Sequence, residues 1–415
     1  MWPRRRCSIV ATCVFALGSP SYCQCITDLG VLPGLVWSEA ESVSDDGSVV
    51  VGRCWSESSE PRAFLWGAAS GMRSIDAIGD VPSDATAVSA DGTTIVGWRS
   101  SEWVYVGFRL RITGDESEFS DLGDDDWCGC AAIPSGVSAD GRVVVATLDC
   151  PFGLPYAAIS TDGQASMLVF EEIPFSWGWA ISADGTVATA STASGISGEH
   201  LGVTWRAESG LEPLVPPPGL SNVWPGALNS NGDMIAGSVG TSGGRQAFLW
   251  SARDGFGLLG PRDASRNEFA RDICDNGSVI VGVSQSSDED RAVVWLFGGS
   301  ALLLRDLITT RGIDAAEWSE LNVAAAISGD GRFVVGHGVH RGEVHAFLVD
   351  FGEDPWPICT ADLNADAVVT GSDLGILLFQ WGPASAGTVS DLNRDGQVDG
   401  ADLGVLLNAW GRCPN

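Results

Sequence analysis

A short sequence phrase recurs seven times along this chain of 415 residues. Each copy has an aliphatic residue, then Ser, Asn or Cys, then any residue, then Asp-Gly or Asn-Gly, and an apolar run follows. The phrase recurs on average every ~47 residues, and its glycines are Gly47, Gly92, Gly141, Gly185, Gly232, Gly277 and Gly331. Such regular spacing means that one supersecondary unit is used seven times, so the fold must stack or circle seven similar units.

The repeated phrase predicts a hairpin, because Asp-Gly and Asn-Gly supply the positive φ values that a tight turn between two strands demands. A second phrase, such as Ala63-Phe64-Leu65-Trp66, follows each glycine at a nearly constant distance and predicts a third strand. A Gly-containing turn and another apolar run, residues 298–308 in the sixth repeat, predict a fourth. Four short strands per repeat of about 47 residues are typical of a β-propeller blade.

The segment before the first repeat supplies the strand that the last repeat lacks. The seventh repeat lacks a fourth strand, and the segment Ile26–Leu32 resembles the fourth-strand segments of other repeats. The sequence therefore predicts an all-β fold, a seven-bladed β-propeller over residues 26–351 that is closed by its N-terminal strand. The competing architecture, an open β-solenoid, needs capping segments that the sequence lacks.

The two phrases also resemble the extracellular HAF repeat family, named for a triplet that is present here as His345-Ala346-Phe347. The resemblance covers roughly residues 26–351 and implies a secreted repeat protein of undefined activity.

Residues 1–25 carry three consecutive Arg, Arg4 to Arg6, followed by an apolar stretch of about a dozen residues, which predicts a secretory signal peptide. No later segment has the roughly 18 apolar residues of a membrane span, so we expect a secreted protein, extracellular or at the cell surface. Cleavage near residue 25 would leave an odd number of cysteines, Cys54, Cys128, Cys130, Cys150, Cys274, Cys359 and Cys413. One thiol is then free or bonded to another molecule, and Cys274, where five repeats have Ser, is the candidate.

The composition excludes several functions. The chain has 53 acidic residues against 23 basic ones, all of them Arg, and a net charge of −30. Without Lys there is no Schiff-base or PLP chemistry and no Walker-type phosphate loop. Nucleic acid is not an expected partner, because a polyanion is repelled by a chain of pI near 4.2.

A different pattern follows a Pro-flanked linker at residues 352–359. Residues 360–415 contain two similar twelve-residue stretches, 362–373 and 391–402, each followed by an apolar run with helical periodicity. Ca²⁺ takes six to eight oxygen ligands, which EF-hand-type loops supply from positions 1, 3, 5, 7, 9 and 12. In the first stretch these positions are Asp362, Asn364, Asp366, the Val368 carbonyl, Thr370 and Asp373. In the second they are Asp391, Asn393, Asp395, the Gln397 carbonyl, Asp399 and Asp402.

These paired loops closely resemble the type I dockerin family, which implies two Ca²⁺ sites, a small α-helical EF-hand-like domain and a cohesin-like or cell-envelope protein as partner. The sixth loop position is Ala367 in the first loop and Gly396 in the second, so we expect the first site to bind Ca²⁺ more weakly. Positions 10 and 11, which help dockerins choose their partners, are the small pairs Gly371-Ser372 and Gly400-Ala401.

Two groups of side chains have alternative interpretations. His337, His340 and His345 suggest a zinc site, but alignment of the repeats favours ordinary blade positions for His337 and His345. Five tryptophans precede the first predicted strand of their repeats, in loops that either pack between blades or present rings to a glycan. They are Trp37, Trp177, Trp179, Trp224 and Trp318.

No catalytic motif appears in the sequence, and no catalytic residue is assigned. The favoured hypothesis is a secreted, non-catalytic binding or scaffold protein whose propeller presents a ligand surface, with a glycan as a candidate ligand, and whose tail anchors it to its partner. The alternative is an extracellular polysaccharide-active hydrolase, a glycosidase or lyase, with acidic residues near the propeller channel. Unmatched acids facing the channel favour the enzyme, whereas a channel lined by equivalent residues favours the binder.

Overall fold

The structure is a computed structural model that describes most of residues 24–352 and 361–412. Outside the description are residues 1–23, 58, 102–103, 115, 123–130, 150–154, 163, 168–174, 195–198, 254, 262, 264, 297–298, 353–360, 362, 364–367, 385–387, 394 and 413–415. The predicted signal peptide, except its last two residues, and the predicted linker, except Gly352, therefore lie outside the described residues.

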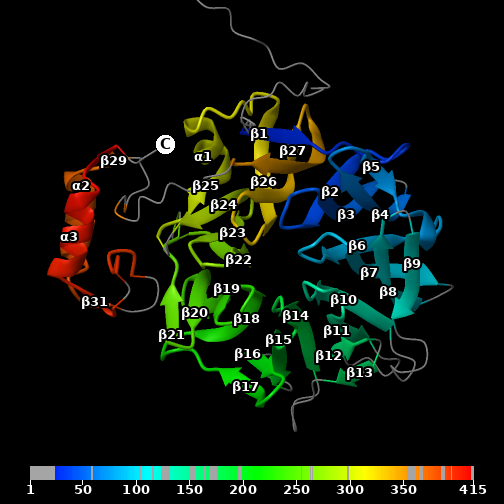
Figure 1. The fold of residues 1–415 in the computed structure, drawn as a ribbon, viewed down its shortest axis with the longest axis horizontal. Helices are drawn as coiled ribbons and strands as arrows, with labels where there is room; N and C mark the ends of the chain where they lie inside the picture. Colours follow the sequence, from blue (N-terminus) through cyan, green and yellow to red (C-terminus); the bar gives the residue numbers. More distant parts are fainter. Residues whose placement is uncertain are drawn as a thin grey trace, which may run out of the picture.

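Seven four-stranded antiparallel sheets form a ring, and each sheet is one blade (Figure 1). Blade one has β2 (Trp37–Val43), β3 (Val49–Ser56), β4 (Ser59–Gly67) and β5 (Gly71–Ser74), followed by a 3₁₀ turn, η1 (Asp76–Ile78). Blade two has β6 (Ser83–Val88), β7 (Thr94–Ser101), β8 (Val104–Thr113) and β9 (Glu116–Leu122). Blade three has β10 (Ala131–Val137), β11 (Val143–Asp149), β12 (Pro155–Thr161) and β13 (Gln164–Met167). Blade four has β14 (Phe175–Ile181), β15 (Val187–Ser194), β16 (Glu199–Arg206) and β17 (Gly210–Leu214).

The remaining blades keep this order. Blade five has β18 (Ser221–Leu228), β19 (Met234–Thr241), β20 (Gly244–Ser251) and β21 (Gly255–Leu258). Blade six has β22 (Asn267–Ile273), β23 (Val279–Gln285), β24 (Asp290–Leu296) and β25 (Leu302–Leu303). Blade seven has β26 (Trp318–Ile327), β27 (Phe333–His340) and β28 (Glu343–Asp350), and its fourth strand is β1 (Cys25–Asp28).

The N-terminal strand closes the ring. β1 runs antiparallel to β28, with Cys25 opposite Asp350 and Asp28 opposite Phe347, and Figure 1 shows β1 in dark blue beside the yellow and orange strands of blade seven. This pairing confirms the seven-bladed β-propeller closed by its N-terminal strand, and it contradicts the open solenoid. The strand begins one residue before the predicted Ile26 and ends at Asp28 instead of Leu32.

The residues of the repeated phrase form a recurring set of hydrogen bonds, here called the hairpin staple, at the turn of each hairpin. In blade three the Ser138 hydroxyl donates to Asp140 Oδ1 over 2.7 Å and accepts the N–H of Val143 over 3.0 Å. Asp140 Oδ1 also accepts the N–H of Arg142 over 3.0 Å, and Gly141 takes a φ of 71°. The same donors and acceptors recur in most of the other blades, and all seven glycines have φ between 67° and 81°. The recurring polar residues of the phrase therefore serve the turn.

The second phrase supplies the core, because its side chains pack between neighbouring sheets. Its phenylalanines are fully buried in four blades, at Phe64, Phe108, Phe248 and Phe347. Among the tryptophans that end the phrase, Trp295 and Trp66 are buried, and Trp205 and Trp250 are partly buried against the same clusters.

Two sequence-based predictions are wrong. In blade six the fourth strand has only two residues, and the rest of the apolar run forms α1 (Leu304–Thr310). Leu304, Leu307 and Ile308 bury one face of this helix, which is the spacing of a helical stripe and not of a strand. The five tryptophans expected in loops lie instead in the first strands of their blades, and Trp318 is buried.

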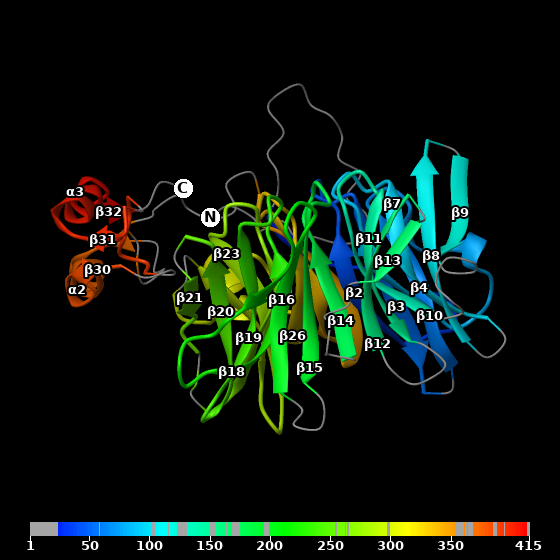
Figure 2. The same ribbon diagram turned by 90° about the horizontal axis from the view of Figure 1, so that it is seen from below.

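The C-terminal residues form a small separate unit outside the ring (Figure 2). It has two helices, α2 (Gly371–Phe379) and α3 (Gly400–Asn408), and four two-residue strands. The strands are β29 (Val368–Val369), β30 (Gly382–Pro383), β31 (Gln397–Val398) and β32 (Gly411–Arg412). Within the described residues no helix is long and apolar enough to cross a membrane, since the longest have nine residues.

Candidate functional site

A cavity of about 240 Å³ lies at the centre of the propeller, lined by the first strands of all seven blades and by the turns that follow them. Part of this wall repeats, because each blade contributes the aliphatic residue of its hairpin phrase. These residues are Val43, Val88, Val137, Ile181, Leu228, Ile273 and Ile327. This part of the wall is equivalent in every blade.

The rest of the wall is not equivalent. Two positions before each aliphatic residue, at the β-bulge of each first strand, every blade carries a different side chain, and all seven line the cavity. They are Glu41, Thr86, Ser135, Trp179, Gly226, Arg271 and Ala325. The sevenfold scaffold therefore encloses an asymmetric site with a carboxylate, a guanidinium and an indole ring. Alignment of the seven phrases already contained this variable column, but only the structure shows that it faces the cavity.

Glu41 belongs to an ionic network that has more acids than bases. Arg53 Nη2 lies 2.6 Å from Glu39 and 3.7 Å from Glu41, and Arg53 Nη1 lies 3.0 Å from Asp84. Burial raises the pKa of Glu41 to about 7, and the negative charge of Asp84 adds to the effect. Burial also raises the pKa of Asp84 to about 6, although Arg53 opposes it. Because one guanidinium serves three carboxyl groups, the network favours holding a proton near neutral pH.

The other carboxylates of the cavity wall connect neighbouring blades. Asp272 Oδ2 accepts the N–H of Ile327 over 2.8 Å, and burial raises the pKa of Asp272 to about 7. Asp45 Oδ1 accepts the N–H of Gly329 over 2.9 Å. Asp275 accepts the hydroxyl of Ser230 in the preceding blade. These three acids are hydrogen-bonded between blades, which gives them a structural role.

Trp179 and Arg271 remain open to the solvent in the cavity. Trp179 is 37% exposed, and its Nε1 donates to Ser191 Oγ over 2.9 Å, which fixes the orientation of the indole ring. Arg271 is exposed and lies in the field of Glu41. An oriented aromatic ring on the same cavity wall as two opposite charges can recognise a polar ligand that has an apolar face.

In the second C-terminal loop the predicted calcium ligands Asp391 and Asp402 accept backbone hydrogen bonds, and among the described residues its carboxylates do not form a group of three with ligand atoms within 4.8 Å of one another. The Asp391 carboxylate accepts the N–H groups of Asp395 over 3.1 Å and of Gly396 over 2.9 Å, so the chain winds around it. Gly396 has a φ of 88°, which favours glycine. The carboxylate of Asp402 is buried and accepts the N–H of Leu392 over 2.7 Å. Four carboxylates, the Asn393 amide and the Gln397 carbonyl lie on this one loop, which fits a hard cation such as Ca²⁺.

Half of the ligands predicted in the first loop lie outside the described residues, namely Asp362, Asn364 and Asp366. Of the others, Val368 lies in β29, and Thr370 and Asp373 form a capping box at the start of α2. Asp373 is buried, and its Oδ2 accepts the N–H of Thr370 over 2.7 Å. Asp399 and Asp402 form the same box at α3, so the described parts of the two loops are built alike.

The two loops belong to one folded unit with internal twofold character. β29 of the first loop pairs with β32 after α3, and β31 of the second loop pairs with β30 after α2. Residues at equivalent positions of the two halves share the buried core, as Leu377 and Leu406 do.

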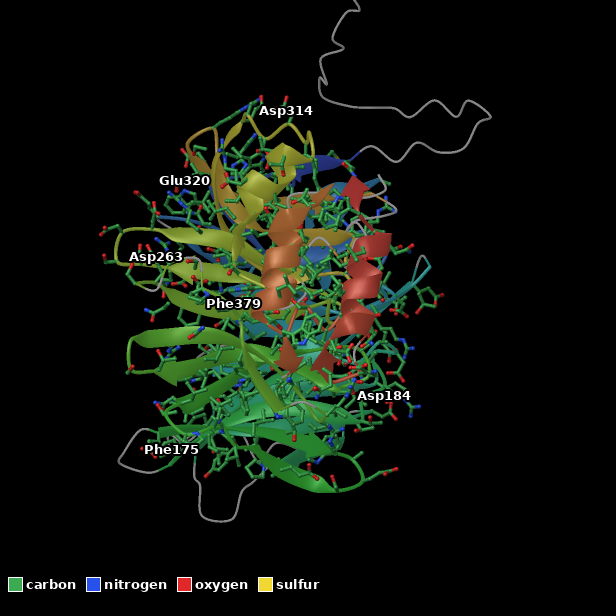
Figure 3. The ribbon with its side chains drawn as sticks, turned by 90° about the vertical axis from the view of Figure 1, so that its left-hand side faces the viewer. Phe175, Asp184, Asp263, Asp314, Glu320 and Phe379 are labelled. Carbon is green, nitrogen blue, oxygen red and sulfur yellow. The ribbon has the colours of Figure 1, made fainter. Side chains whose placement is uncertain are left out.

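The C-terminal unit also exposes apolar side chains that the sequence analysis did not single out. Leu378 and Leu407 are each 52% exposed, and Trp381 and Trp410 are 49% and 48% exposed. The members of each pair occupy equivalent positions in the duplicated sequence, so the two halves of the unit present the same apolar groups. Phe379 is 92% exposed at the end of α2, and Figure 3 shows it beside the orange helix α2. Repeated exposed leucine and tryptophan side chains are typical of a protein-binding surface.

No known protein family matches the sequence, and no curated protein matches it. The structure is similar to oligogalacturonate lyase from Vibrio parahaemolyticus, with a TM-score of 0.54 and 10% identity over 80% of this chain and 94% of that one. It is also similar to the β-propeller domain of the Trilobed protease from Pyrococcus furiosus, with a TM-score of 0.52 and 12% identity over 77% of this chain and 96% of that one. TolB from Acinetobacter baumannii has a TM-score of 0.42 and 12% identity over 75% of this chain, which spans 63% of that protein.

The first two similarities support the propeller fold alone, because sequence identity this low does not carry a function. The Pyrococcus propeller is described as having an open velcro topology, whereas β1 closes the ring here.

Proposed function

We propose that this protein is a secreted, non-catalytic binding protein that holds a glycan in the central cavity of its propeller. The observation that carries the proposal is the variable column of the cavity wall, where seven otherwise equivalent blades present seven different residues. A cavity that served only to pack the blades would have no reason to place Glu41, Trp179 and Arg271 on an otherwise repeated wall.

The chemistry of this column suits a saccharide. Trp179 offers a ring face for stacking, and Glu41 and Arg271 offer an acceptor and donors for hydroxyl groups. The volume of about 240 Å³ lies below the roughly 300–1,000 Å³ of typical small-molecule pockets, so the cavity suits one sugar residue or a chain end.

The alternative, a polysaccharide-active hydrolase or lyase, is favoured by the unmatched cavity acids Glu41 and Asp272, whose pKa values burial raises to about 7. The similar structure from Vibrio parahaemolyticus, an oligogalacturonate lyase, makes oligogalacturonate a substrate to include in a test. A glycosidase needs two carboxyl groups that flank the scissile bond. Since Asp45, Asp272 and Asp275 accept hydrogen bonds from their neighbours, Glu41 lacks a second acid of that kind, and binding is the better-supported function.

A glycan array that includes oligogalacturonides, probed with the full chain, tests the proposal. We expect saccharide binding that Trp179→Ala and Arg271→Gln each weaken at least tenfold in calorimetry, while Arg73→Gln on the outer strand of blade one leaves it unchanged. Mass spectrometry of the bound glycans separates the two functions. If the bound glycan is cleaved and Glu41→Gln abolishes this cleavage, the protein is an enzyme and not a binding protein. If neither Trp179→Ala nor Arg271→Gln weakens binding, the cavity is not the binding site.

For the C-terminal unit we propose a dockerin-like anchor that binds two Ca²⁺ and attaches the protein to a cohesin-like or cell-envelope partner. The winding of the second loop around Asp391 and the duplicated exposed leucines and tryptophans support it. Bound Ca²⁺ would neutralise the clustered carboxylates and so order the unit.

Equilibrium dialysis of the full chain measures this directly. We expect two Ca²⁺ per chain with unequal affinities, the weaker belonging to the loop with Ala367, and one Ca²⁺ in Asp395→Ala. Asp288→Asn, which removes an exposed acid of blade six, should leave both sites intact. Unchanged stoichiometry in Asp395→Ala would contradict the assignment of the second loop.

A further inference from the structure

Two histidines and an aspartate meet where β1 closes the propeller. His345 Nδ1 lies 2.9 Å from Asp28 Oδ1, and His340 Nδ1 lies 3.1 Å from Asp28 Oδ2. One potential metal-binding atom from each of these residues lies within 4.8 Å of the other two. His340 and His345 lie on the paired strands β27 and β28 of one blade, and Asp28 on β1 joins them because the ring is closed.

These separations are near those of ligands around a single ion. Zinc bonds of about 2.0–2.1 Å to nitrogen and oxygen, at tetrahedral angles, place ligand atoms about 3.3 Å apart. The two nitrogen–oxygen distances, 2.9 Å from His345 to Asp28 Oδ1 and 3.1 Å from His340 to Asp28 Oδ2, are a few tenths of an ångström shorter and involve different carboxylate oxygens, so a small rotation of Asp28 would place one oxygen at the ion. The side chains are largely covered, with 29% exposure for Asp28, 8% for His340 and 17% for His345, so the site is partly shielded while water can still reach it.

The surroundings also orient the ligands as a metal site requires. Glu317 Oε2 lies 3.4 Å from His340 Nε2, on the ring nitrogen that faces away from Asp28. A carboxylate behind a ligating imidazole fixes its tautomer and raises its basicity. The ring of Trp318 lies against that of His340, with centroids 4.8 Å apart. The N–H of Gly30 donates to Asp28 Oδ1 over 2.9 Å, which holds the carboxylate in place.

We propose that Asp28, His340 and His345 bind one Zn²⁺ ion, with water as a fourth ligand, and that this ion locks the closing strand of the propeller. Two imidazoles and one carboxylate suit zinc and not Ca²⁺, which prefers oxygen ligands. The site is therefore distinct from the C-terminal loops. The ion would stabilise the closed ring, because β1 pairs with β28 through four residues and coordination of Asp28 and His345 would add a further link between these strands.

Metal analysis of the chain from residue 24 onwards tests the proposal. After removal of metals with EDTA, the protein is dialysed against Zn²⁺ in excess Ca²⁺, so that the C-terminal loops are already filled. We expect one Zn²⁺ per chain, and Co²⁺ in its place should give the visible absorption of a tetrahedral site. Hydrogen exchange of the β1 amides should slow when Zn²⁺ is added, which also gives a readout on closure itself.

Variants decide whether this cluster is the site. His345→Gln and the nearly isosteric Asp28→Asn should each weaken Zn²⁺ binding by at least 100-fold, and Glu317→Gln by about 10- to 100-fold. His200→Gln in blade four is the matched control and should change nothing. If the wild-type chain takes up no Zn²⁺, or if Asp28→Asn binds it as the wild type does, the cluster is a set of hydrogen-bonded side chains and the proposal is overturned.

Discussion

Replacing Glu41 by Gln should stabilise the propeller above neutral pH. The carboxyl group of Glu41 has a pKa of about 7 in the folded protein, against an ordinary value of 4.5. Between these two pH values the folded state holds a proton that the unfolded state has released, so stability falls as the pH rises from about 4.5 to about 7. Above pH 7 the loss is complete and stays constant. Gln cannot ionise, so the variant avoids this loss.

The size of the effect follows from the same pKa values. A rise from 4.5 to about 7 corresponds to about 3 kcal/mol between the two protonation states. Because the Glu41 side chain is 32% exposed, solvent screening reduces this to about 2 kcal/mol. Arg53 keeps Glu39 and Asp84 as partners in the variant, so no unpaired guanidinium offsets the gain.

Urea unfolding at pH 4.5 and pH 8, followed by tryptophan fluorescence, measures the difference. We expect Glu41→Gln and the wild type to have similar free energies of unfolding at pH 4.5, and the variant to be more stable by about 2 kcal/mol at pH 8. Glu212→Gln, an exposed carboxyl on β17, should change neither value. If Glu41→Gln is less stable than the wild type at pH 8, the carboxylate is stabilised by Arg53 and the account of the network is refuted.

Three further expectations follow from the blades. Gly47→Ala should cost more stability than Gly71→Ala, although both glycines have φ near 67°. A Cβ at Gly47 would lie 2.6 Å from a phenylalanine ring of blade seven, whereas a Cβ at Gly71 would meet open space. The second variant should lose about 1–2 kcal/mol and the first about 1–3 kcal/mol more in urea unfolding. Ser138→Ala removes two hydrogen bonds and should cost about 1–2 kcal/mol at pH 7. The hydrogen bond from Ser138 lowers the pKa of Asp140. Its contribution to the free energy of unfolding is therefore present above pH 3.8 and is lost as the pH falls through the pKa of the folded protein. The difference in stability between Ser138→Ala and the wild type should therefore be smaller in acid than at pH 7. The thiol of Cys274 is free and buried, and burial raises its pKa, so iodoacetamide should label it in urea and not in the native protein, as peptide mapping by mass spectrometry can check.

Most of the fold could be predicted from the sequence, because local turn chemistry and long-range order agree in every repeat. The Asp-Gly turns require positive φ at one fixed position, and that position sets the register of the two strands around it. The prediction of a full fourth strand in blade six was wrong for a local reason. A run of three leucines suits a strand or a helix equally well. Here the helix forms because it buries Leu304, Leu307 and Ile308 on one face.

The site was harder to predict, because the residues that form it are not those that repeat. Glu41, Trp179 and Arg271 stand in one column of the repeat alignment, but nothing in a single strand says that the column faces a cavity. His337 and His345 were interpreted as blade positions, and they do lie in β27 and β28. The sequence predicted closure of the ring by the N-terminal segment, but the register of β1 on β28, which brings Asp28 near His345, is not encoded in either strand alone.

The architecture explains why a new site can arise in such a column. The polar residues of each phrase, Ser and Asp in five blades, are constrained by the turn, and the aliphatic residue two positions after the column repeats in every blade. The column residue lies at the β-bulge of its strand and needs only to fit the cavity, so residues from Gly to Trp are tolerated. Substitution there changes the ligand surface while the hairpin staple and the packing between blades are kept. For this reason, exchanging Trp179 or Arg271 should alter binding far more than stability, and unfolding measured on the variants used for the glycan array separates the two effects.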